Sequence, residues 1–182
     1  MKKWNIRIPE RKTVSALTFG CGVSTLTAAV LASKGYSSPE SVINDLQADG
    51  LSDPFLIKDM QKAADAVNNA IDSGMKLCIY GDYDCDGIMS TAILYSYLAE
   101  IGADVMYYIP ERSEGYGLNT TAIDKLSDSG VNMIITVDNG ITAISEAEYI
   151  YALGMKLIVT DHHQQGDTLP RAEAVVDPHR HD

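Results

Sequence analysis

From residue 75 onward, short apolar runs alternate with longer segments in which apolar residues recur every three or four positions. The runs at 76–80, 104–109, 132–137 and 155–160 predict β-strands, and the segments 88–101, 120–129 and 142–153 predict helices. Glycines at 102, 130 and 154 fall between a helix and the next strand, where helices commonly end. This alternation predicts an α/β fold, a parallel sheet with helices on both faces.

The first 74 residues have a different pattern, which indicates helices without strands. Ser38-Pro39-Glu40 is a typical helix start, with serine as the N-cap and proline in the first turn. Apolar residues from Pro54 to Ile71 have the spacing of an amphipathic helix, and Gly74 ends it. We therefore divide the chain into a helical N-terminal region, residues 1–74, and an α/β domain, residues 75–182.

The composition is that of a globular protein, since 46% of the 182 residues are hydrophobic and 21% are charged. No apolar run has the length of a membrane span, and no signal-peptide core follows the first lysines. The three cysteines form no C-x-x-C pair, which is typical of reduced thiols. These features predict a cytoplasmic protein without a membrane partner.

The net charge of −11 argues against a free-standing nucleic-acid binder that relies on broad charge attraction. It does not argue against a nucleic-acid enzyme whose acidic cluster is covered by divalent cations. The basic residues are unevenly placed, because five of the fourteen fall within the first twelve positions. A solvated tail is the simplest interpretation of that basic segment.

Acidic motifs follow three of the predicted strands. Asp82, Asp84 and Asp86 alternate directly after the first strand, Asp138 follows the third, and Asp161-His162-His163 follows the fourth. Because ligands of parallel sheets bind beyond the carboxyl ends of the strands, we expect the three motifs to meet. Three ionised carboxylates in one turn repel one another, so their proximity indicates a bound cation.

Each acidic motif has an alternative interpretation. Asp-x-Asp-x-Asp-Gly also begins a calcium EF-hand loop, but the glutamate needed at position twelve is replaced by Ile93, and a strand precedes the motif. A solvated surface turn stays open for the same residues. Asn139-Gly140 would suit a hairpin, although a helical pattern follows it.

The chemistry of these residues indicates a phosphate-cleaving metal site. Carboxylates with one or two imidazoles suit Mn²⁺ or Mg²⁺, and a pair of such ions can hydrolyse phosphoesters or phosphoanhydrides. One histidine could bind metal while the other contacts phosphate or transfers a proton, and Asp161 could orient a ring.

A glycine-bearing loop follows the second predicted strand. Arg112 could bind a phosphate through two hydrogen bonds, and Tyr116, between Gly115 and Gly117, could stack on a base. A plain connecting loop is the alternative interpretation.

The combination of motifs resembles the DHH phosphoesterases, whose name is the string Asp161-His162-His163, and within them the bacterial RecJ-like single-stranded-DNA-specific exonucleases. The other strings that carry the resemblance are residues 80–87, 114–118 and 137–140, and it extends over essentially the whole chain. The resemblance implies 5′-to-3′ degradation of single-stranded DNA with two Mn²⁺ or Mg²⁺ ions, in recombination and repair.

The resemblance also implies a role for each motif residue. It implies metal ligands at Asp82, Asp84, Asp86, Asp138 and His162, catalytic roles for His163 and the supporting Asp161, and DNA contacts at Arg112, Tyr116 and Gly117. His163 would face the scissile phosphate.

The chain departs from the family pattern at Asn139 and, more seriously, in its length. RecJ-like proteins continue into a DHH-associated domain and an OB-fold, and have another metal-binding aspartate well beyond the DHH string. We therefore expect an N-terminal fragment that is weakly active or inactive. The alternatives are a DHH phosphodiesterase for oligonucleotides or cyclic dinucleotides, which typically has histidine at the position of Asp82, and a non-catalytic DHH scaffold.

Overall fold

The computed structural model of the chain describes residues 8–46 and 52–180, so Lys2, Lys3 and Arg7 of the basic segment lie outside the described residues. The chain separates into two compact units, residues 1–51 and residues 52–182. Each unit is built around its own buried apolar residues, and each is described by itself.

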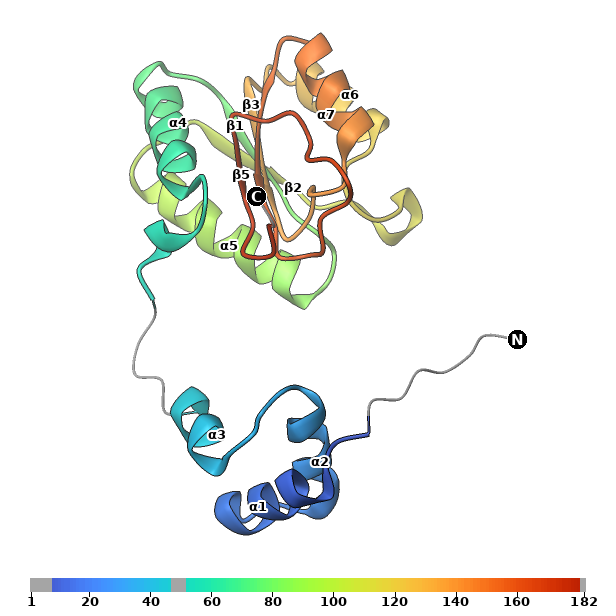
Figure 1. Cartoon of the computed structure of the whole chain (residues 1–182). Helices are drawn as coiled ribbons and strands as arrows, with labels where there is room; N and C mark the ends of the chain where they lie inside the picture. The colour runs from blue at the N-terminus through green and yellow to red at the C-terminus, as the bar shows by residue number, and fades with distance from the viewer. Residues whose placement is uncertain (1–7, 47–51, 181–182) are drawn as a thin grey trace, which may run out of the picture. The chain divides into compact units, whose positions relative to one another are not determined.

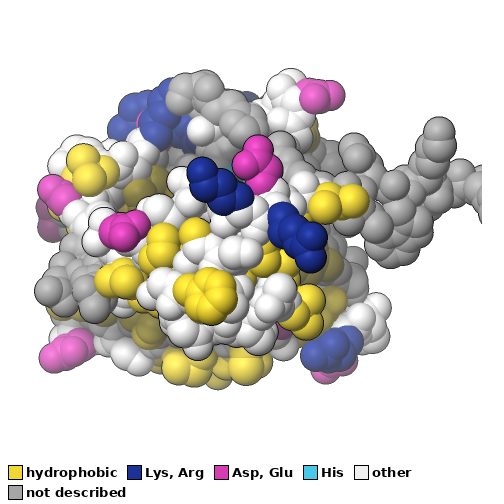
Figure 2. Space-filling model, turned by 60° about the horizontal axis from the view of Figure 1, so that its bottom comes forward, with side chains coloured by type: hydrophobic (Ala, Val, Ile, Leu, Met, Phe, Trp, Pro, Cys, Tyr) yellow, Lys and Arg dark blue, Asp and Glu magenta, His cyan; other side chains and the backbone are white. Residues whose placement is uncertain are grey.

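The first unit is helical, as the sequence predicts. It contains α1 (Arg11–Cys21), α2 (Thr25–Ser33) and α3 (Pro39–Leu46), the last starting where the Ser-Pro-Glu signal places it. Its small core consists of Leu17, Ala28 and Val42. Other large apolar side chains of this unit, among them Phe19 and Leu26, are exposed, and Figure 2 shows hydrophobic side chains on one face of the molecule.

Among the described residues, no single helix has both the length and the apolar character needed to cross a membrane. Helices α1 and α2 meet those criteria only when they are counted together, across a bend of 119°.

The second unit contains one parallel sheet, which confirms the predicted α/β fold. Its strands are β1 (Leu77–Tyr80), β2 (Val105–Tyr108), β3 (Met133–Val137), β4 (Lys156–Thr160) and β5 (Ala174–Val176), and their order is β2-β1-β3-β4-β5 (Figure 1). Every neighbouring pair is parallel. Strand β5 has three residues and was not predicted, because so short a run has no readable periodicity.

Helices cover both faces of this sheet, as predicted. Helices α4 (Met60–Asp72) and α5 (Cys85–Glu100) lie on one face, and α6 (Thr120–Asp128) and α7 (Ile144–Ala152) lie on the other (Figure 1). Side chains of β1 alternate between the two layers, with Leu77 and Ile79 in the core under α4 and α5, and Cys78 and Tyr80 in the core under α6 and α7. The inner strands β1 and β3 are buried along their whole length and are almost entirely apolar, whereas Tyr107 of the edge strand β2 is exposed.

Helix α4 differs from its prediction, because the amphipathic pattern from Pro54 does not form one helix. A short 3₁₀ turn, η1 (Pro54–Leu56), is followed by extended and left-handed residues before α4 begins at Met60. Asp59 has φ 61°, and its carboxylate lies 2.8 Å from Arg180 Nη1 and accepts a 3.4 Å hydrogen bond from the Val175 N–H. These contacts join the segment before α4 to β5, so α4 belongs to the second compact unit. The domain boundary that the sequence predicts at residues 74–75 is a separate matter and stays a prediction.

Helix α5 begins three residues earlier than predicted. Asp84 is its N-cap and accepts a 3.1 Å hydrogen bond from the Gly87 N–H. Asp86 lies in the first turn. Two of the three carboxylates of the first motif therefore lie at the positive end of the helix dipole, where negative charge is favoured.

The strand order explains why the acidic motifs meet. The chain runs from β1 outward to β2 and then returns to β3 on the other side of β1, so the connections after β1 and β3 diverge. A crevice forms at such a switch point, beyond the carboxyl ends of the strands. The three acidic motifs follow β1, β3 and β4, so they all lie at this edge of the sheet, as predicted.

Candidate metal centre

The turn after β1 is held against the start of α5 by two glycines. A Cβ atom on Gly87 would lie 2.6 Å from the Asp82 carbonyl oxygen, and one on Gly81 would collide with Thr91. The close approach fixes Asp82 and Asp84 relative to each other. Asp82 is 1% exposed, and its Oδ1 has no hydrogen-bond partner. The Gly87 N–H keeps the pKa of the exposed Asp84 below its ordinary value.

Asp138 is held in an unusual backbone conformation at the end of β3. Its φ of 64° is in the left-handed region, which few residues other than glycine adopt. Its N–H donates to the Thr160 carbonyl of β4 at 3.1 Å. The next residue, the buried Asn139, donates from Nδ2 to the Tyr80 carbonyl at 3.2 Å and to the Val137 carbonyl at 3.0 Å. This strained position is therefore fixed by contacts with both neighbouring strands.

The Asp138 carboxylate has no hydrogen bond to offset its burial. Both of its oxygens are buried and neither accepts a hydrogen bond. Burial, followed by the charges of Asp86 and Asp84, raises the pKa of Asp138. A buried carboxylate without backbone N–H donors is costly, and a divalent cation would offset that cost.

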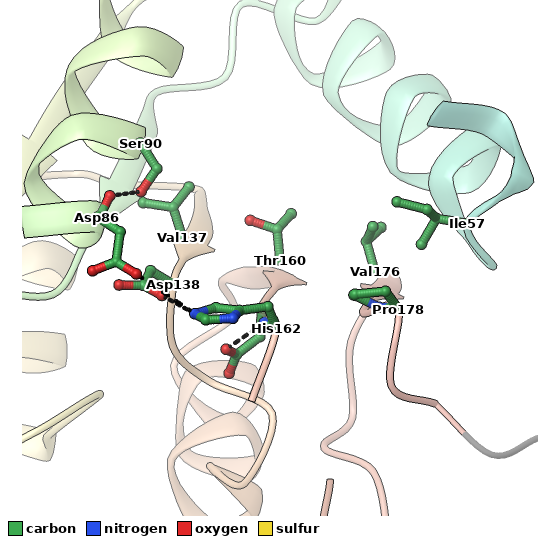
Figure 3. A pocket seen from close by; sticks show the side chains of 10 residues that line it. Ile57, Asp86, Ser90, Val137, Asp138, Thr160, His162, Val176 and Pro178 are labelled. Atoms are coloured by element: carbon green, nitrogen blue, oxygen red, sulfur yellow. Dashed lines mark hydrogen bonds and ion pairs between the residues drawn. The ribbon is translucent and has the colours of Figure 1, made fainter. Parts of the chain in front are cut away.

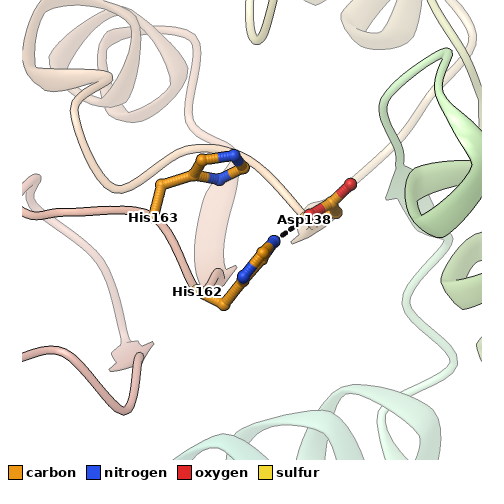
Figure 4. Close-up of side chains that lie close together, drawn as sticks. All are labelled: Asp138, His162 and His163. Carbon is orange, nitrogen blue, oxygen red and sulfur yellow. Dashed lines mark ion pairs between the residues drawn. The ribbon is translucent and has the colours of Figure 1, made fainter. Parts of the chain in front are cut away.

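His162 points at this carboxylate. Its Nε2 lies 2.9 Å from Asp138 Oδ1, and Figure 4 shows the His162 ring turned toward this carboxylate. Asp86 Oδ2 lies 3.7 Å from the same nitrogen. Imidazole nitrogen and carboxylate oxygen atoms that converge in this way are the arrangement expected of ligands that share one cation.

Asp161, which directly precedes His162, has surroundings opposite to those of Asp138, because its carboxylate oxygens accept several hydrogen bonds. Its Oδ1 accepts the N–H groups of His162 at 2.7 Å and His163 at 3.1 Å, and lies 2.7 Å from His163 Nδ1. Its Oδ2 accepts the Ile141 N–H at 2.9 Å. Asp161 therefore orders the turn and orients the His163 ring, and its hydrogen bond to that ring raises the pKa of His163.

The loop after β2 reaches the centre through Tyr116. Its hydroxyl donates to the Asp138 carbonyl at 3.2 Å and lies 3.3 Å from His163 Nδ1, and the two rings meet edge to face. Burial and four nearby carboxylates raise the pKa of this hydroxyl. Gly117, at φ 77°, accepts a 3.0 Å hydrogen bond from the Tyr80 hydroxyl at its carbonyl. The Arg112 guanidinium lies 4.9 Å from the centre of the Tyr83 ring.

Two groups of side chains could each hold a cation. Asp82, Asp84 and Asp138 form one group, and Asp138, His162 and His163 form the other, with the offered atoms of each group within 4.8 Å of one another. Asp138 belongs to both, so its two oxygens could bridge two ions. The buried oxygens of Asp82 and Asp138 that lack hydrogen bonds fit Mn²⁺ or Mg²⁺. Asp86, predicted as a ligand, belongs to neither group and lies beside His162 instead.

Asn139 was missed by the sequence analysis as a site residue. The Asn-Gly pair reads as a turn signal, and only the register of β1 beside β3 places Asn139 beneath both strands. Sequence spacing contained no sign of that contact.

The comparisons with known proteins agree with this geometry. The model of the "DHH family, N-terminal domain" matches residues 76–182. The chain is 40% identical over 180 residues to the single-stranded-DNA-specific exonuclease RecJ of Bacillus subtilis, an alignment that covers 97% of this chain and 23% of that protein.

Solved structures agree with the fold as well. A crystal structure of exonuclease RecJ bound to manganese superposes with a TM-score of 0.63 and 38% identity, covering 67% of this chain and 31% of that chain. RecJ from Thermus thermophilus in complex with Mn²⁺ gives a TM-score of 0.62 and 28% identity, covering 95% of this chain and 24% of that chain. The chain thus spans about a quarter of these relatives. Since the family match covers more than half of the chain, the protein belongs to the DHH family.

Proposed function

We propose that the chain provides the metal-binding core of an enzyme that hydrolyses phosphodiester bonds in single-stranded DNA from the 5′ end, with Mn²⁺ or Mg²⁺. The observation that supports it best is that the ends of β1 and β3 present unpartnered oxygens of Asp82 and Asp138, beside two histidines that follow β4. The names of its relatives support the substrate. Recombination and repair, and a cytoplasmic location, are part of the same proposal.

The residues have distinct proposed roles. Asp82, Asp84, Asp138 and His162 hold the cations, with Asp138 shared and Asp86 adding negative charge beside His162. When bound, two such cations lower the pKa of a water molecule and neutralise charge on the phosphoryl group. Residues 75–182 form the DHH domain that contains this site, and residues 1–74 are a helical region before it.

His163 is proposed to face the scissile phosphate. Asp161 keeps its Nδ1 side fixed and favours the protonated ring, so the other edge can donate to a phosphate oxygen. Asp161 is therefore a positioning residue. Arg112 and Tyr116 are proposed to contact DNA near the centre, Gly117 giving the loop its left-handed turn. Because the Tyr116 hydroxyl already contacts Asp138 and His163, its ring has an orientation that is set before DNA binds.

Calorimetry with Mn²⁺ tests the metal site. We expect the chain to bind Mn²⁺, Asp138→Asn to weaken binding strongly and Asp84→Ala to weaken it less, because Asp138 contributes to both groups. Asp128→Asn, an exposed aspartate at the end of α6, is the control. Equal affinity in all four proteins would refute the proposed centre.

Product analysis tests the reaction and separates the alternatives. Incubation of 5′-labelled single-stranded DNA with Mn²⁺ should release 5′ mononucleotides slowly, and Asp138→Asn should abolish the release. Hydrolysis of short oligonucleotides or cyclic dinucleotides in preference to long DNA would favour another DHH phosphodiesterase. A chain that binds no Mn²⁺ would favour a scaffold.

A further inference from the structure

Two features of the second unit reach the metal centre. One is a pocket of about 410 Å³, which Asp138 and His162 line (Figure 3). The other is the loop between β2 and α6, whose Tyr116 does not line that pocket. The Tyr116 hydroxyl lies 3.2 Å from the Asp138 carbonyl and 3.3 Å from His163 Nδ1, which is long for hydrogen bonds of a hydroxyl group. These two contacts alone do not explain how the loop is held.

The loop around Tyr116 has little packing of its own. Gly115 and Gly117 adopt φ 94° and φ 77°, and a Cβ atom on either glycine would meet no atom within 4 Å beyond its chain neighbours. Tyr116, between them, is 53% exposed. Because glycine leaves the backbone free to adopt many conformations, this part of the loop has to be fixed by hydrogen bonds.

The Tyr80 hydroxyl supplies such a hydrogen bond. Tyr80 is the last residue of β1, is fully buried, and stacks on the Tyr108 ring with the ring centres 5.2 Å apart. Its hydroxyl donates to the Gly117 carbonyl at 3.0 Å, and its backbone carbonyl accepts from Asn139 Nδ2 at 3.2 Å. Asn139 directly follows Asp138. One rigid residue therefore connects the loop to the strand end that presents Asp138.

Asn119 determines the direction in which the Tyr80 hydroxyl donates. Asn119 Nδ2 donates to the Tyr80 hydroxyl oxygen at 3.2 Å, while its Oδ1 accepts the Ala122 N–H at 2.8 Å and caps α6. A phenol hydroxyl has a single proton. Because Asn119 offers a donor, that proton is directed to the Gly117 carbonyl. Burial raises the pKa of Tyr80, so the hydroxyl keeps its proton.

We propose that Tyr80 and Asn119 are positioning residues, which hold Tyr116 in place at the metal centre before DNA binds. Their chain of hydrogen bonds ends on the Gly117 carbonyl, in the residue that follows Tyr116. This role rests on the proposed function, because Tyr116 is proposed to contact DNA. Without the chain of hydrogen bonds, DNA would have to order the loop when it binds, which weakens binding.

Tyr80→Phe tests the role of the hydroxyl, because it keeps the buried ring and removes the donor to Gly117. In the metal-free chain, the {¹H}–¹⁵N NOE of the Gly115 and Gly117 amides should fall, which reports faster motion of the loop. Tyr151→Phe is the control, since it removes a hydroxyl that lies 2.9 Å from Glu173, outside this loop. Equally ordered loop amides in Tyr80→Phe and the unchanged chain would overturn the inference.

Asn119→Asp tests the direction of the proton. Aspartate caps a helix as well as asparagine does, but it offers Tyr80 a second acceptor in place of a donor, so the proton turns away from Gly117. The loop should loosen as in Tyr80→Phe, whereas Asn119→Ser, which caps without competing for the proton, should loosen it less. Thr121→Asp adds the same charge in the surface pocket that Asn119 also lines and should leave the loop ordered. Equal loop order in Asn119→Asp and Asn119→Ser would refute the role of Asn119.

A double-variant experiment connects the loop to the substrate. In the release of 5′ nucleotides with Mn²⁺, Tyr80→Phe should raise the KM for single-stranded DNA roughly tenfold, with kcat and Mn²⁺ affinity nearly unchanged. In a Tyr116→Ala background, Tyr80→Phe should raise the KM no further, because Tyr80 acts through Tyr116. Independent effects that add in the double variant would mean a general structural role and would overturn the inference.

The two kinds of measurement separate this role from the proposed function. The order of the loop amides is measured without metal or substrate, so an unchanged loop in Tyr80→Phe would overturn the positioning role and leave the proposed function standing. A chain whose loop responds as expected but which binds neither Mn²⁺ nor DNA would refute the proposed function, and the positioning role with it.

Discussion

Asp138 and Asp161 are buried carboxylates beside the same two histidines, yet their hydrogen bonds give them different tasks. Asp161 accepts backbone N–H groups at both oxygens, whereas Asp138 accepts none. The sequence predicted that both belong to the site, because each follows an apolar strand. It could not separate a positioning carboxylate from a ligand, since that difference arises from which N–H groups the fold brings near each oxygen.

Asp161→Asn should destabilise the metal-free protein by about 1–3 kcal/mol, because one backbone N–H would then face an amide donor instead of an oxygen. Urea denaturation with a chelator measures the loss. Asp86→Asn is the control, since that side chain is 66% exposed and its removal lessens repulsion with Asp138. An equal loss of stability in both variants would contradict the role given to Asp161.

His163 should make the stability of the metal-free protein depend on pH. Its pKa is raised above the ordinary 6.5, mainly by the hydrogen bond to Asp161, so the folded state holds the proton more tightly than the unfolded chain. The stabilisation is complete below about pH 6.5 and is lost as the pH rises through the raised pKa. Melting temperatures with a chelator should therefore fall more from about pH 6 to pH 8 in the unchanged chain than in His163→Gln; parallel curves would contradict the assignment.

Among the elements, those with long periodic patterns were predicted and those set by contacts were not. The strands β1 to β4 and helices α5 to α7 lie at the predicted places, with ends shifted by a few residues. The break before α4 was missed, because it depends on Asp59 meeting Arg180 far along the chain. The start of α5 was missed because its N-cap, Asp84, reads equally well as a strand-end ligand.

The contact between β1 and α5 should tolerate no side chain at residue 87. In Gly87→Ala the added Cβ would lie 2.6 Å from the Asp82 carbonyl, so the helix start must move away from the turn. We expect a destabilisation of about 1–3 kcal/mol and weaker Mn²⁺ binding, because Asp82 and Asp84 would separate. Gly166→Ala, where the nearest atom is 4.0 Å away, should change neither quantity. Chemical denaturation and calorimetry measure both, and intact Mn²⁺ affinity in Gly87→Ala would show that the tight turn is dispensable.

The ion pair between Asp59, just before α4, and Arg180, after β5, should contribute more to the free energy of unfolding than a surface ion pair does. Arg180→Ala removes the 2.8 Å partner of the largely buried Asp59, which keeps Lys62 at 2.9 Å, and should cost about 1.5–3 kcal/mol. Arg171→Ala removes an exposed pair with Glu148 at 3.4 Å and should cost about 1 kcal/mol or less. Urea denaturation compares the two variants, and equal costs would mean that burial of the Asp59–Arg180 pair has no energetic consequence.

At the scale of the whole molecule, the net charge and the length of the chain limit how well these 182 residues can degrade DNA alone. The net charge is −11, and the relatives contain about four times as much chain, most of it without a counterpart here. The acidic motifs after the strands predicted a metal-covered site, and the fold brought the carboxylates together as expected. The way in which DNA is bound could not be predicted from the sequence, because a binding groove is formed by surfaces that face the metal centre only in the folded protein.

We therefore expect the 182-residue chain to degrade single-stranded DNA far more slowly than the Bacillus subtilis relative does. Its acidic surface repels the phosphate backbone. Asp84 is exposed and His162 is 56% exposed on its side chain, so water competes for the ions and the substrate is poorly positioned. Release of labelled 5′ nucleotides with Mn²⁺ at about 20 mM and about 200 mM salt measures this, and added salt should weaken the repulsion and narrow the difference from the relative. A rate close to that of the relative at low salt would mean that the charge and openness of this centre do not limit catalysis, and that the described strand ends alone hold DNA.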